Sequence, residues 1–336
     1  MIVRQNKKFF IGEMSGTQDR LEPGNYLLKF DPKQGFYLVE KENFILPGKL
    51  YGDFSIVDRY LKAWENNVEK NMGVLLSGEK GSGKTITAEM LCMKAKMPVI
   101  IIDYSYKDTE MIDFLTNPYF SNSIIFIDEY EKVFSKWEDQ DFILPLFDGG
   151  FSTKLLFLLT VNDISKVSSY FVNRPGRIKY HKFFGILPED TIKEVINDLL
   201  VNKNHTASVH QVLDRLPAPS FDILVNIIKD MNLFQEDAVQ VARHFNLKDE
   251  ERTYSVVYYD EEGKEYKCAD ARLSPTEEYL YIYTDKPYNE EDDTEVRFWF
   301  QDCDIKREGR RITIFDRKTK EKAILQQKDK YHYLAF

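Results

Sequence analysis

The chain has 336 residues, of which 43% are apolar, 30% charged and 14% aromatic, and its formal net charge is −9 at pH 7. This length predicts two or three domains, and the composition excludes wholesale disorder and a fibrous protein. The acidic balance argues against a chain-wide electrostatic footprint for DNA or RNA.

Neither the cysteines nor the apolar runs indicate secretion or a membrane. Cys92, Cys268 and Cys303 are far apart and lack CxxC spacing, so neither a disulfide framework nor a zinc site is indicated. The N-terminal segment lacks the apolar core of a secretion signal, and no run approaches membrane-spanning length. We therefore expect a soluble protein of the cytoplasm that does not bind a membrane.

Residues 1–50 predict a small β-rich N-terminal element. The alternating runs YLLKF (26–30) and FYLVE (36–40) are joined by DPKQG, which is typical of a hairpin turn. An amphipathic helix is predicted over 53–70, because apolar residues recur there at helical spacing: Phe54, Val57, Leu61, Trp64 and Val68.

An α/β core is predicted over residues 51–187. Short apolar runs lie at 73–77, 99–102, 124–127 and 155–160, with helical patterns between them. Continuous apolar strands that alternate with helices indicate a parallel sheet covered on both faces.

The C-terminal half predicts two further domains. Residues 188–248 show only helical patterns and predict a small bundle, and residues 249–336 return to strand patterns and predict an all-β domain. The expected strands of that domain are 254–259, 279–283, 296–300 and 312–315.

The segment GEKGSGKT (78–85) follows an apolar strand and opens a helix, as a phosphate-binding loop requires. Its glycines let the backbone N–H groups face phosphates, Lys84 is expected to meet the β- and γ-phosphates of ATP, and Thr85 is expected to coordinate Mg²⁺. The expected ATP-binding residues of this segment are Gly78, Glu79, Lys80, Gly81, Ser82, Gly83, Lys84, Thr85 and Ile86.

Two later strands end in polar residues that suit hydrolysis. Asp128 and Glu129 follow the strand 124–127, and we expect Asp128 to bind ATP through its Mg²⁺ and Glu129 to activate the attacking water. Asn162 follows the strand 155–160 and could hydrogen-bond the γ-phosphate and that water. In isolation such residues more often serve a solvated strand end or a turn, but their order after the loop favours a functional role.

Arg174 and Arg177 lie on the turn NRPGR. A guanidinium can neutralise charge on a transferred phosphoryl group, so both arginines are candidate catalytic residues. Taken without the other motifs, they would be two surface arginines beside a Pro-Gly turn.

In this order the motifs resemble the AAA branch of the AAA+ ATPase family over about residues 51–247. They comprise Walker A GEKGSGKT, Walker B IIFIDE, the helix end ILPLFDGG, the sensor-1 strand LLFLLTVN, the RPGR arginine-finger motif and a helical lid beginning LPEDTIKEV. The resemblance implies a P-loop NTPase core with a small helical lid. It also implies a homo-oligomeric ring, commonly a hexamer, in which Arg174 and Arg177 reach ATP bound by the neighbouring subunit. Tyr51 and Gly52 stand where the family contacts adenine.

The sequence departs from the family pattern in two places. Residues 103–123 are short and lack the aromatic–hydrophobic–glycine triplet of members that thread polypeptides, and Tyr104, Tyr106 and Tyr119-Phe120 are more readily explained by core and turn packing. No arginine stands at the start of the third lid helix, where PAPS (217–220) lies, so a sensor-2 arginine is not expected.

Three functions remain open from the sequence. The first is an oligomeric ATPase that remodels or assembles an unidentified protein partner, with the terminal β regions as docking elements. The second is a nucleic-acid-directed motor or loader, suggested by the basic residues between Lys306 and Lys330 with Phe315 and Tyr331 nearby. Acidic residues interrupt that run, so nucleic acid is not favoured. The third is a scaffold switched by ATP.

Overall fold

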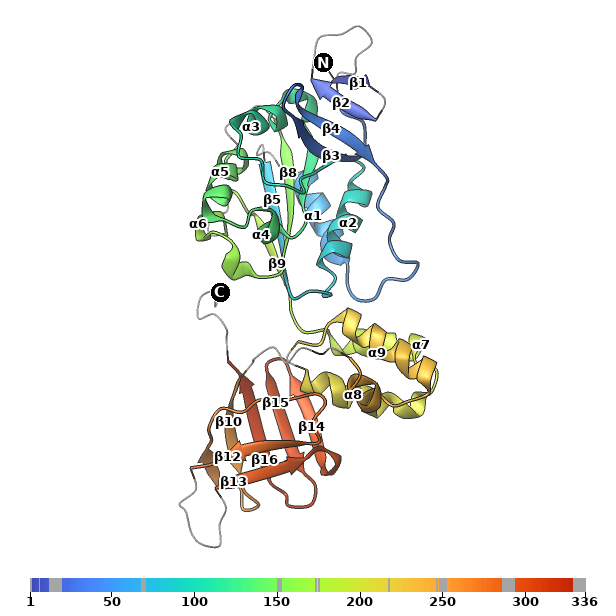
Figure 1. The fold of residues 1–336 in the computed structure, drawn as a ribbon, viewed down its shortest axis with the longest axis vertical. Helices are drawn as coiled ribbons and strands as arrows, with labels where there is room; N and C mark the ends of the chain where they lie inside the picture. The colour runs from blue at the N-terminus through green and yellow to red at the C-terminus, as the bar shows by residue number, and fades with distance from the viewer. Residues whose placement is uncertain are drawn as a thin grey trace. The chain divides into compact units, whose positions relative to one another are not determined.

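The computed structural model describes residues 2–5, 7–11, 20–67, 71–149, 153–172, 174, 176–216, 218–245, 247, 253–285 and 294–328. These residues belong to two compact units, 1–185 and 186–336 (Figure 1). The division of the chain into four parts stays a prediction of the sequence.

One nine-stranded sheet forms the centre of the first unit, in the order β1-β2-β4-β3-β6-β7-β8-β5-β9. The neighbours from β3 to β9 run parallel, and the four N-terminal strands pair antiparallel. The strands are β1 (Ile2–Gln5), β2 (Lys8–Ile11), β3 (Gly24–Asp31), β4 (Gly35–Lys41), β5 (Asn71–Gly78), β6 (Pro98–Ile101), β7 (Ser123–Ile127), β8 (Leu155–Val161) and β9 (Tyr180–Phe184). The predicted α/β fold with a largely parallel sheet is confirmed.

Helices cover both faces of this sheet. One apolar cluster packs α1 (Ser55–Glu65) and α2 (Lys84–Ala95) against it, and a second packs α3 (Thr109–Leu115), α4 (Tyr130–Val133), α5 (Trp137–Phe147) and α6 (Ser169–Val172). The strand β8 contributes to both, because Leu156 and Leu158 belong to the first cluster while Phe157 and Leu159 belong to the second. This alternation explains why the strand reads as a continuous apolar run.

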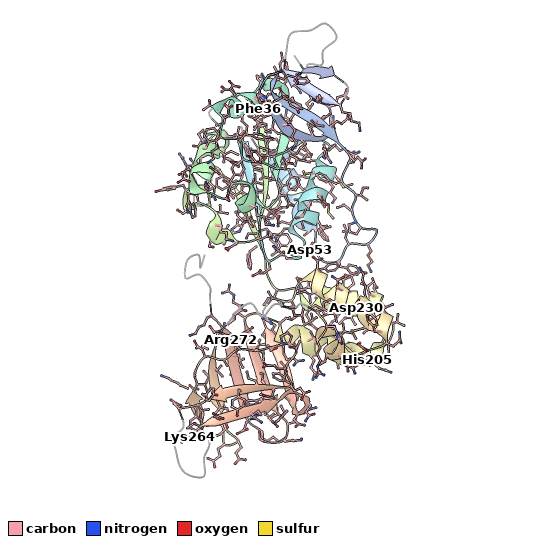
Figure 2. All side chains as sticks on the ribbon, viewed as in Figure 1. Phe36, Asp53, His205, Asp230, Lys264 and Arg272 are labelled. Atoms are coloured by element: carbon pink, nitrogen blue, oxygen red, sulfur yellow. The ribbon has the colours of Figure 1, made fainter. Side chains whose placement is uncertain are left out.

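The N-terminal strands are continuous with the sheet of the core. The predicted hairpin is present as β3 and β4, and β3 also pairs in parallel with β6, with Asn25 opposite Val99. Figure 2 marks Phe36 on β4. The centre of its ring lies 5.3 Å from that of Tyr106, and this aromatic packing strengthens the junction. The predicted boundary at residue 50 is therefore not a break in the sheet.

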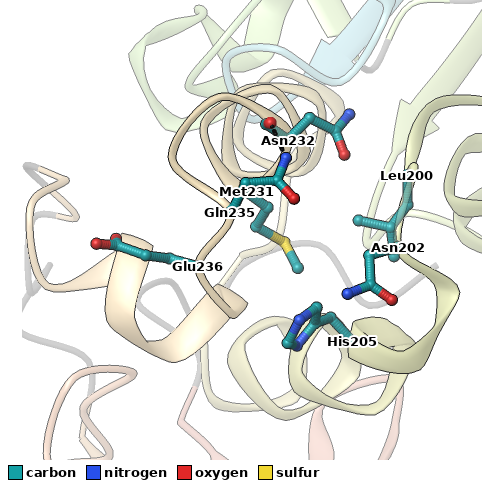
Figure 3. A pocket seen from close by; sticks show the side chains of 7 residues that line it. All are labelled: Leu200, Asn202, His205, Met231, Asn232, Gln235 and Glu236. Atoms are coloured by element: carbon teal, nitrogen blue, oxygen red, sulfur yellow. Dashed lines mark hydrogen bonds between the residues drawn. The ribbon is translucent and has the colours of Figure 1, made fainter.

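Four α-helices begin the second unit: α7 (Glu189–Leu199), α8 (Thr206–Arg215), α9 (Phe221–Phe234) and α10 (Ala238–Ala242). The helices α8, α9 and α10 pack against one another, and α7 packs against α9. A crevice of about 10 Å³ lies between them, which is near the minimum for one water molecule. Figure 3 shows its lining residues, Leu200, Asn202, His205, Met231, Asn232, Gln235 and Glu236, and a crevice of this size is no ligand site.

Antiparallel strands complete the second unit and share one core. A five-stranded sheet has the order β11-β10-β16-β15-β14, and β12 pairs with β13. The strands are β10 (Tyr254–Tyr259), β11 (Glu265–Lys267), β12 (Tyr279–Tyr283), β13 (Glu295–Trp299), β14 (Cys303–Glu308), β15 (Arg311–Asp316) and β16 (Lys322–Gln327). The predicted all-β C-terminal region is confirmed, and it includes three strands that the sequence did not predict, β11, β14 and β16.

Two arginines join the helix α8 to these strands. Arg215 is 2% exposed, donates to the carbonyl of Glu277 at 2.8 Å and lies 4.7 Å from the ring centre of Phe300. Burial lowers the pKa of Arg215 to about 10, and the charge of Arg243 acts in the same direction. Arg307 of β14 donates to the carbonyls of Asp214 and Leu216, at the C-terminal end of α8. The orphan carbonyls of the helix are thus satisfied from the sheet.

Three basic residues in the run between Lys306 and Lys330 pair with nearby carboxylates. Lys306 pairs with Glu308 at 2.7 Å, Lys318 pairs with Asp302 at 2.8 Å, and Arg317 lies 3.7 Å from Asp304. Tyr331, which the sequence placed beside this run, lies outside the described residues. Among the helices that the structure describes, none has the length and apolar character needed to cross a membrane.

Candidate functional site

Three predicted site segments meet at one edge of the parallel sheet. The strand β8 lies between β5, which ends in the glycine-rich loop (residues 78–85), and β7, which is followed by Asp128 and Glu129. Because parallel strands end at the same edge, residues after β8 can contact both neighbours. The strand order therefore explains why Asn162 belongs to the same site as the acidic pair.

The glycine-rich loop needs glycine at its turning points. Gly78 has φ +145°, and a Cβ atom there would lie 2.1 Å from the carbonyl oxygen of Phe184. Gly83 has φ +95° and precedes α2 without a side-chain cap. Backbone N–H groups at such a helix start form a site for anions.

The side chain of Lys84 folds back on this loop. Its Nζ donates to the carbonyls of Gly78 and Glu79, both at 2.7 Å, and lies 3.4 Å from Ser82 Oγ. Lys84 is 5% exposed, and burial lowers its pKa while nearby carboxylates, Glu131 first, oppose that shift. The ammonium group is thus held at the glycine-rich loop, and its predicted contact with phosphates stays a prediction.

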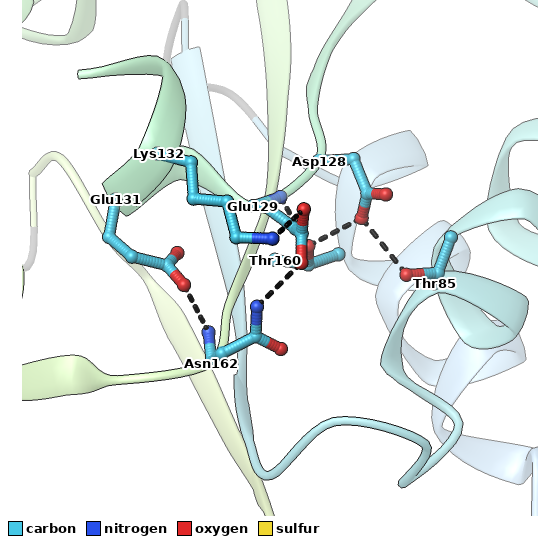
Figure 4. Close-up of polar contacts among 7 residues, drawn as sticks. All are labelled: Thr85, Asp128, Glu129, Glu131, Lys132, Thr160 and Asn162. Carbon is cyan, nitrogen blue, oxygen red and sulfur yellow. Dashed lines mark hydrogen bonds and ion pairs between the residues drawn. The ribbon is translucent and has the colours of Figure 1, made fainter. Parts of the chain in front are cut away.

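A hydroxyl from β8 links the loop to the acidic pair (Figure 4). Thr85 Oγ1 donates to Asp128 Oδ1 at 3.0 Å, and Thr160 Oγ1 donates to the same oxygen at 2.6 Å. The backbone N–H of Glu129 in turn donates to Thr160 Oγ1 at 2.8 Å. Thr160 therefore fixes the two carboxylate residues relative to each other.

Both carboxylate oxygens of Glu129 are engaged. Asn162 Nδ2 donates to Oε1 at 2.8 Å, and Lys132 Nζ lies 2.5 Å from Oε2. The hydrogen bond from Lys132 lowers the pKa of Glu129, burial opposes this shift, and Asn162 adds to it. Glu129 also has φ +50°, a left-handed backbone that a non-glycine residue rarely adopts and that is concentrated at functional sites.

Thr85 and Asp128 fit a Mg²⁺ site that a phosphate group would complete. Among the described residues, no cluster of three or more His, Cys, Asp or Glu side chains could hold a metal ion. The contact between Thr85 Oγ1 and Asp128 Oδ1 instead offers two hard oxygen atoms. Mg²⁺ commonly takes one or two such protein ligands and fills its other positions with phosphate oxygens and water.

The two predicted arginines have different environments. Arg177 is 8% exposed and forms a fork with Asp148, from Nε to Oδ1 at 2.6 Å and from Nη2 to Oδ2 at 2.8 Å. Its Nη1 donates to the carbonyl of Tyr170 at 2.8 Å. The side chain of Arg174 is 63% exposed and only approaches Asp148, at 3.4 Å. Arg177 is therefore buried and paired within the chain, whereas Arg174 is exposed; the catalytic role of both arginines stays a prediction.

Replacing Arg177 with alanine is expected to destabilise the first unit, because the Asp148 carboxylate loses its paired donors. The loss should be about 1 to 3 kcal/mol, since that carboxylate remains partly exposed. Arg177 holds the pKa of Asp148 below its ordinary value, so the stabilisation is present at neutral pH and is lost as the pH falls through the lowered pKa. Calorimetry across a pH series measures this pH-dependent stabilisation. Arg174→Ala is the matched control, and equal unfolding of both variants would contradict the assignment.

The remaining predicted ATP-binding residues include Lys80, Ile86, Tyr51 and Gly52. Lys80 is exposed, and Ile86 is half-buried in the first turn of α2. Tyr51 and Gly52 precede α1, with Lys49 Nζ 5.0 Å from the Tyr51 ring centre, and their role at adenine stays a prediction. Of the aromatic residues in 103–123, Tyr106 packs on Phe36, Phe120 is buried and Tyr104 is 63% exposed.

Sequence reasoning missed four side chains that shape the site: Thr160, Glu131, Lys132 and Asp148. Thr160 could have been found, because a hydroxyl at the end of an apolar strand beside Asn162 is a local signal. The hydrogen bond between Glu131 Oε1 and the N–H of Asn162, at 3.0 Å, joins residues 31 positions apart and leaves no mark in the local pattern.

The chain was compared with known proteins. Residues 74–186 match the family described as ATPase family associated with various cellular activities (AAA), and no curated protein matches. Two similar solved structures are the FIGL-1 AAA domain in complex with ADP and the FIGL-1 AAA domain. Each is 16% identical with a TM-score of 0.42; they cover 61% and 58% of this chain and 79% and 74% of their own. On the family match, residues 74–186 are an AAA domain.

Proposed function

We propose that this protein hydrolyses ATP as an oligomeric AAA+ ring and uses the cycle to remodel or assemble a protein partner. The observation that carries the proposal is the hydrogen-bonded path from Thr85 through Asp128 and Thr160 to Glu129, and from there to Asn162. This path places a candidate metal-binding pair, a candidate base and a candidate sensor beside the glycine-rich loop.

ATP binding is assigned to the loop and to Lys84. Backbone N–H groups at the start of α2 would receive the phosphates, and the Lys84 ammonium would exchange its carbonyl acceptors for β- and γ-phosphate oxygens. Thr85 and Asp128 would hold Mg²⁺, which supplies positive charge to the phosphates when bound. Tyr51 and Gly52 would contact adenine.

Hydrolysis is assigned to Glu129 and Asn162. Glu129 would take a proton from the water that attacks the γ-phosphorus, while the bond from that phosphorus to the bridging oxygen breaks and ADP leaves. Asn162 already holds Oε1 of Glu129 and would orient it. The ion pair with Lys132 engages the other oxygen and lowers the pKa of Glu129, so the carboxylate would be a stronger base once Lys132 moves away.

Replacing Lys84 with alanine tests the binding step. The loss of charge-assisted hydrogen bonds worth about 2 to 3 kcal/mol should weaken ATP binding roughly 30- to 150-fold. Titration with a fluorescent ATP analogue measures the dissociation constant. Lys94→Ala is the matched control, because Lys94 lies on the same helix but pairs with Asp58. A wild-type chain that binds no ATP, or a Lys84→Ala variant that binds like wild type, would overturn the proposed site.

The protein partner can be sought by affinity capture with Glu129→Gln, which should hold ATP-bound assemblies together. A remodelling enzyme should change its ATP turnover when the captured partner is added, whereas turnover in a scaffold timed by ATP should not respond. The pairing of Lys306, Arg317 and Lys318 with carboxylates weighs against the nucleic-acid alternative.

A further inference from the structure

Glu131 is a buried carboxylate beside the proposed catalytic residues. It is the second residue of the short helix α4 and is 7% exposed, whereas its neighbour Lys132 is exposed. Its Oε1 accepts the backbone N–H of Asn162 at 3.0 Å. Its Oε2 is buried and has no hydrogen-bond partner among the residues that the structure describes.

Such an oxygen is costly to keep in a folded protein. Burying a polar atom without a partner is unfavourable, and more so if the group is charged. An apolar or amide side chain would avoid much of that cost, although the charge of Glu131 also acts on the buried ammonium group of Lys84. A buried acid with one unpartnered oxygen close to a site therefore calls for a functional reason.

The contacts of Glu131 supply that reason. Glu131 fixes the main chain of Asn162, and the side chain of Asn162 fixes Oε1 of Glu129. Glu129 and Glu131 are two residues apart in sequence, yet Asn162 joins them from the neighbouring strand end (Figure 4). A shift of the Asn162 backbone would therefore be passed on to the candidate base.

We propose that Glu131 is a positioning residue for ATP hydrolysis, which sets the backbone of Asn162 through Oε1 so that Asn162 presents Glu129 to the attacking water. This assignment rests on the proposed function of the site. Glu131 does not touch the reacting atoms; it acts through the hydrogen bond that it accepts.

Alanine and glutamine substitutions separate this role from a merely structural one. Glu131→Ala removes the acceptor and should lower kcat between about 10- and 100-fold, while KM for ATP stays within about twofold. Glu131→Gln keeps an oxygen that can accept the same N–H and should retain kcat within about threefold of wild type.

The double variant Glu131→Ala with Asn162→Ala should lose little more kcat than Asn162→Ala alone, because the two residues act in series. Glu138→Ala, an exposed acid on α5, is the matched control.

Hydrogen exchange at the Asn162 amide gives a readout that needs no catalysis. This amide should exchange faster in Glu131→Ala than in wild type, and Glu131→Gln should keep its protection. Unchanged protection in Glu131→Ala overturns the proposal, whether or not the protein hydrolyses ATP. Wild-type kcat in a folded Glu131→Ala variant, or a Glu131→Gln variant as impaired as alanine, also overturns it. A wild-type chain without ATPase activity contradicts the proposed function alone, and the exchange result then decides the role of Glu131.

Discussion

Replacing Arg174 with alanine is expected to lower ATP turnover by a factor on the order of 10³, because a guanidinium that meets the transferred phosphoryl group contributes that much in related reactions. The free energy of unfolding of the first unit should not change in Arg174→Ala, because the Arg174 side chain is 63% exposed and its ion pair with Asp148 is long, at 3.4 Å. ATP affinity measured under non-turnover conditions should stay close to that of wild type. Steady-state phosphate release measures the effect.

A mixture of two inactive variants tests whether Arg174 acts on a neighbouring subunit. Arg174→Ala subunits keep Glu129, and Glu129→Gln subunits keep Arg174, so some interfaces in a mixed ring hold both groups. Mixing should therefore restore part of the activity that each variant lacks alone. Lys33→Ala, an exposed cation in the β3–β4 turn, is the control for loss of surface charge. Full activity of Arg174→Ala alone, or no recovery in the mixture, would argue against a shared site.

Replacing Glu129 with glutamine is expected to reduce the rate of ATP hydrolysis between about 10²- and 10⁴-fold, the range typical of a lost general base. The amide retains an oxygen for Asn162 Nδ2 but cannot take a proton from water at neutral pH. ATP binding should persist, because Lys84 and the glycine-rich loop are unchanged. Single-turnover phosphate release and equilibrium ATP binding separate the two steps.

Glu110→Gln is a suitable control for the Glu129 variant, since Glu110 is an exposed acid on α3. Light scattering with ATP should show an oligomer that is longer-lived in Glu129→Gln than in wild type. If Glu129→Gln hydrolyses ATP at the wild-type rate, Glu129 is not the base. The variant Lys132→Met tests the ion pair separately, because it frees Oε2 of Glu129 without removing the carboxylate.

The sequence predicted the parts of the fold whose signals are local. The strand at 254–259 and the strand at 279–283 lie where their alternation placed them, and the hairpin at 26–40 follows its turn residues. The glycine-rich loop was predictable because Gly78 and Gly83 are required by the backbone of the turn itself. Each of these signals is local in the sequence, and the longest, the hairpin at 26–40, spans 15 residues.

Other features depend on contacts between distant residues. The pairing of β3 with β6 joins residues more than 70 positions apart, so a hairpin that looked like a separate element extends the core sheet. The strand β14 (CDIKRE) has four charged residues among six, and these hid its alternation. Arg177 reads like Arg174 in sequence, and only its fork with Asp148 separates the two.

The junction between α8 and the C-terminal strands limits how the chain can be divided or exchanged. Arg215 is buried between Glu277 and Phe300, and Arg307 satisfies the carbonyl groups at the end of α8. A chain shortened before residue 253 would leave the Arg215 guanidinium with only the Gln211 carbonyl as acceptor, and would leave the end of α8 without its donor Arg307. The helices and the strands therefore depend on each other, and another helical bundle grafted in place of these helices would need both arginine contacts to be rebuilt.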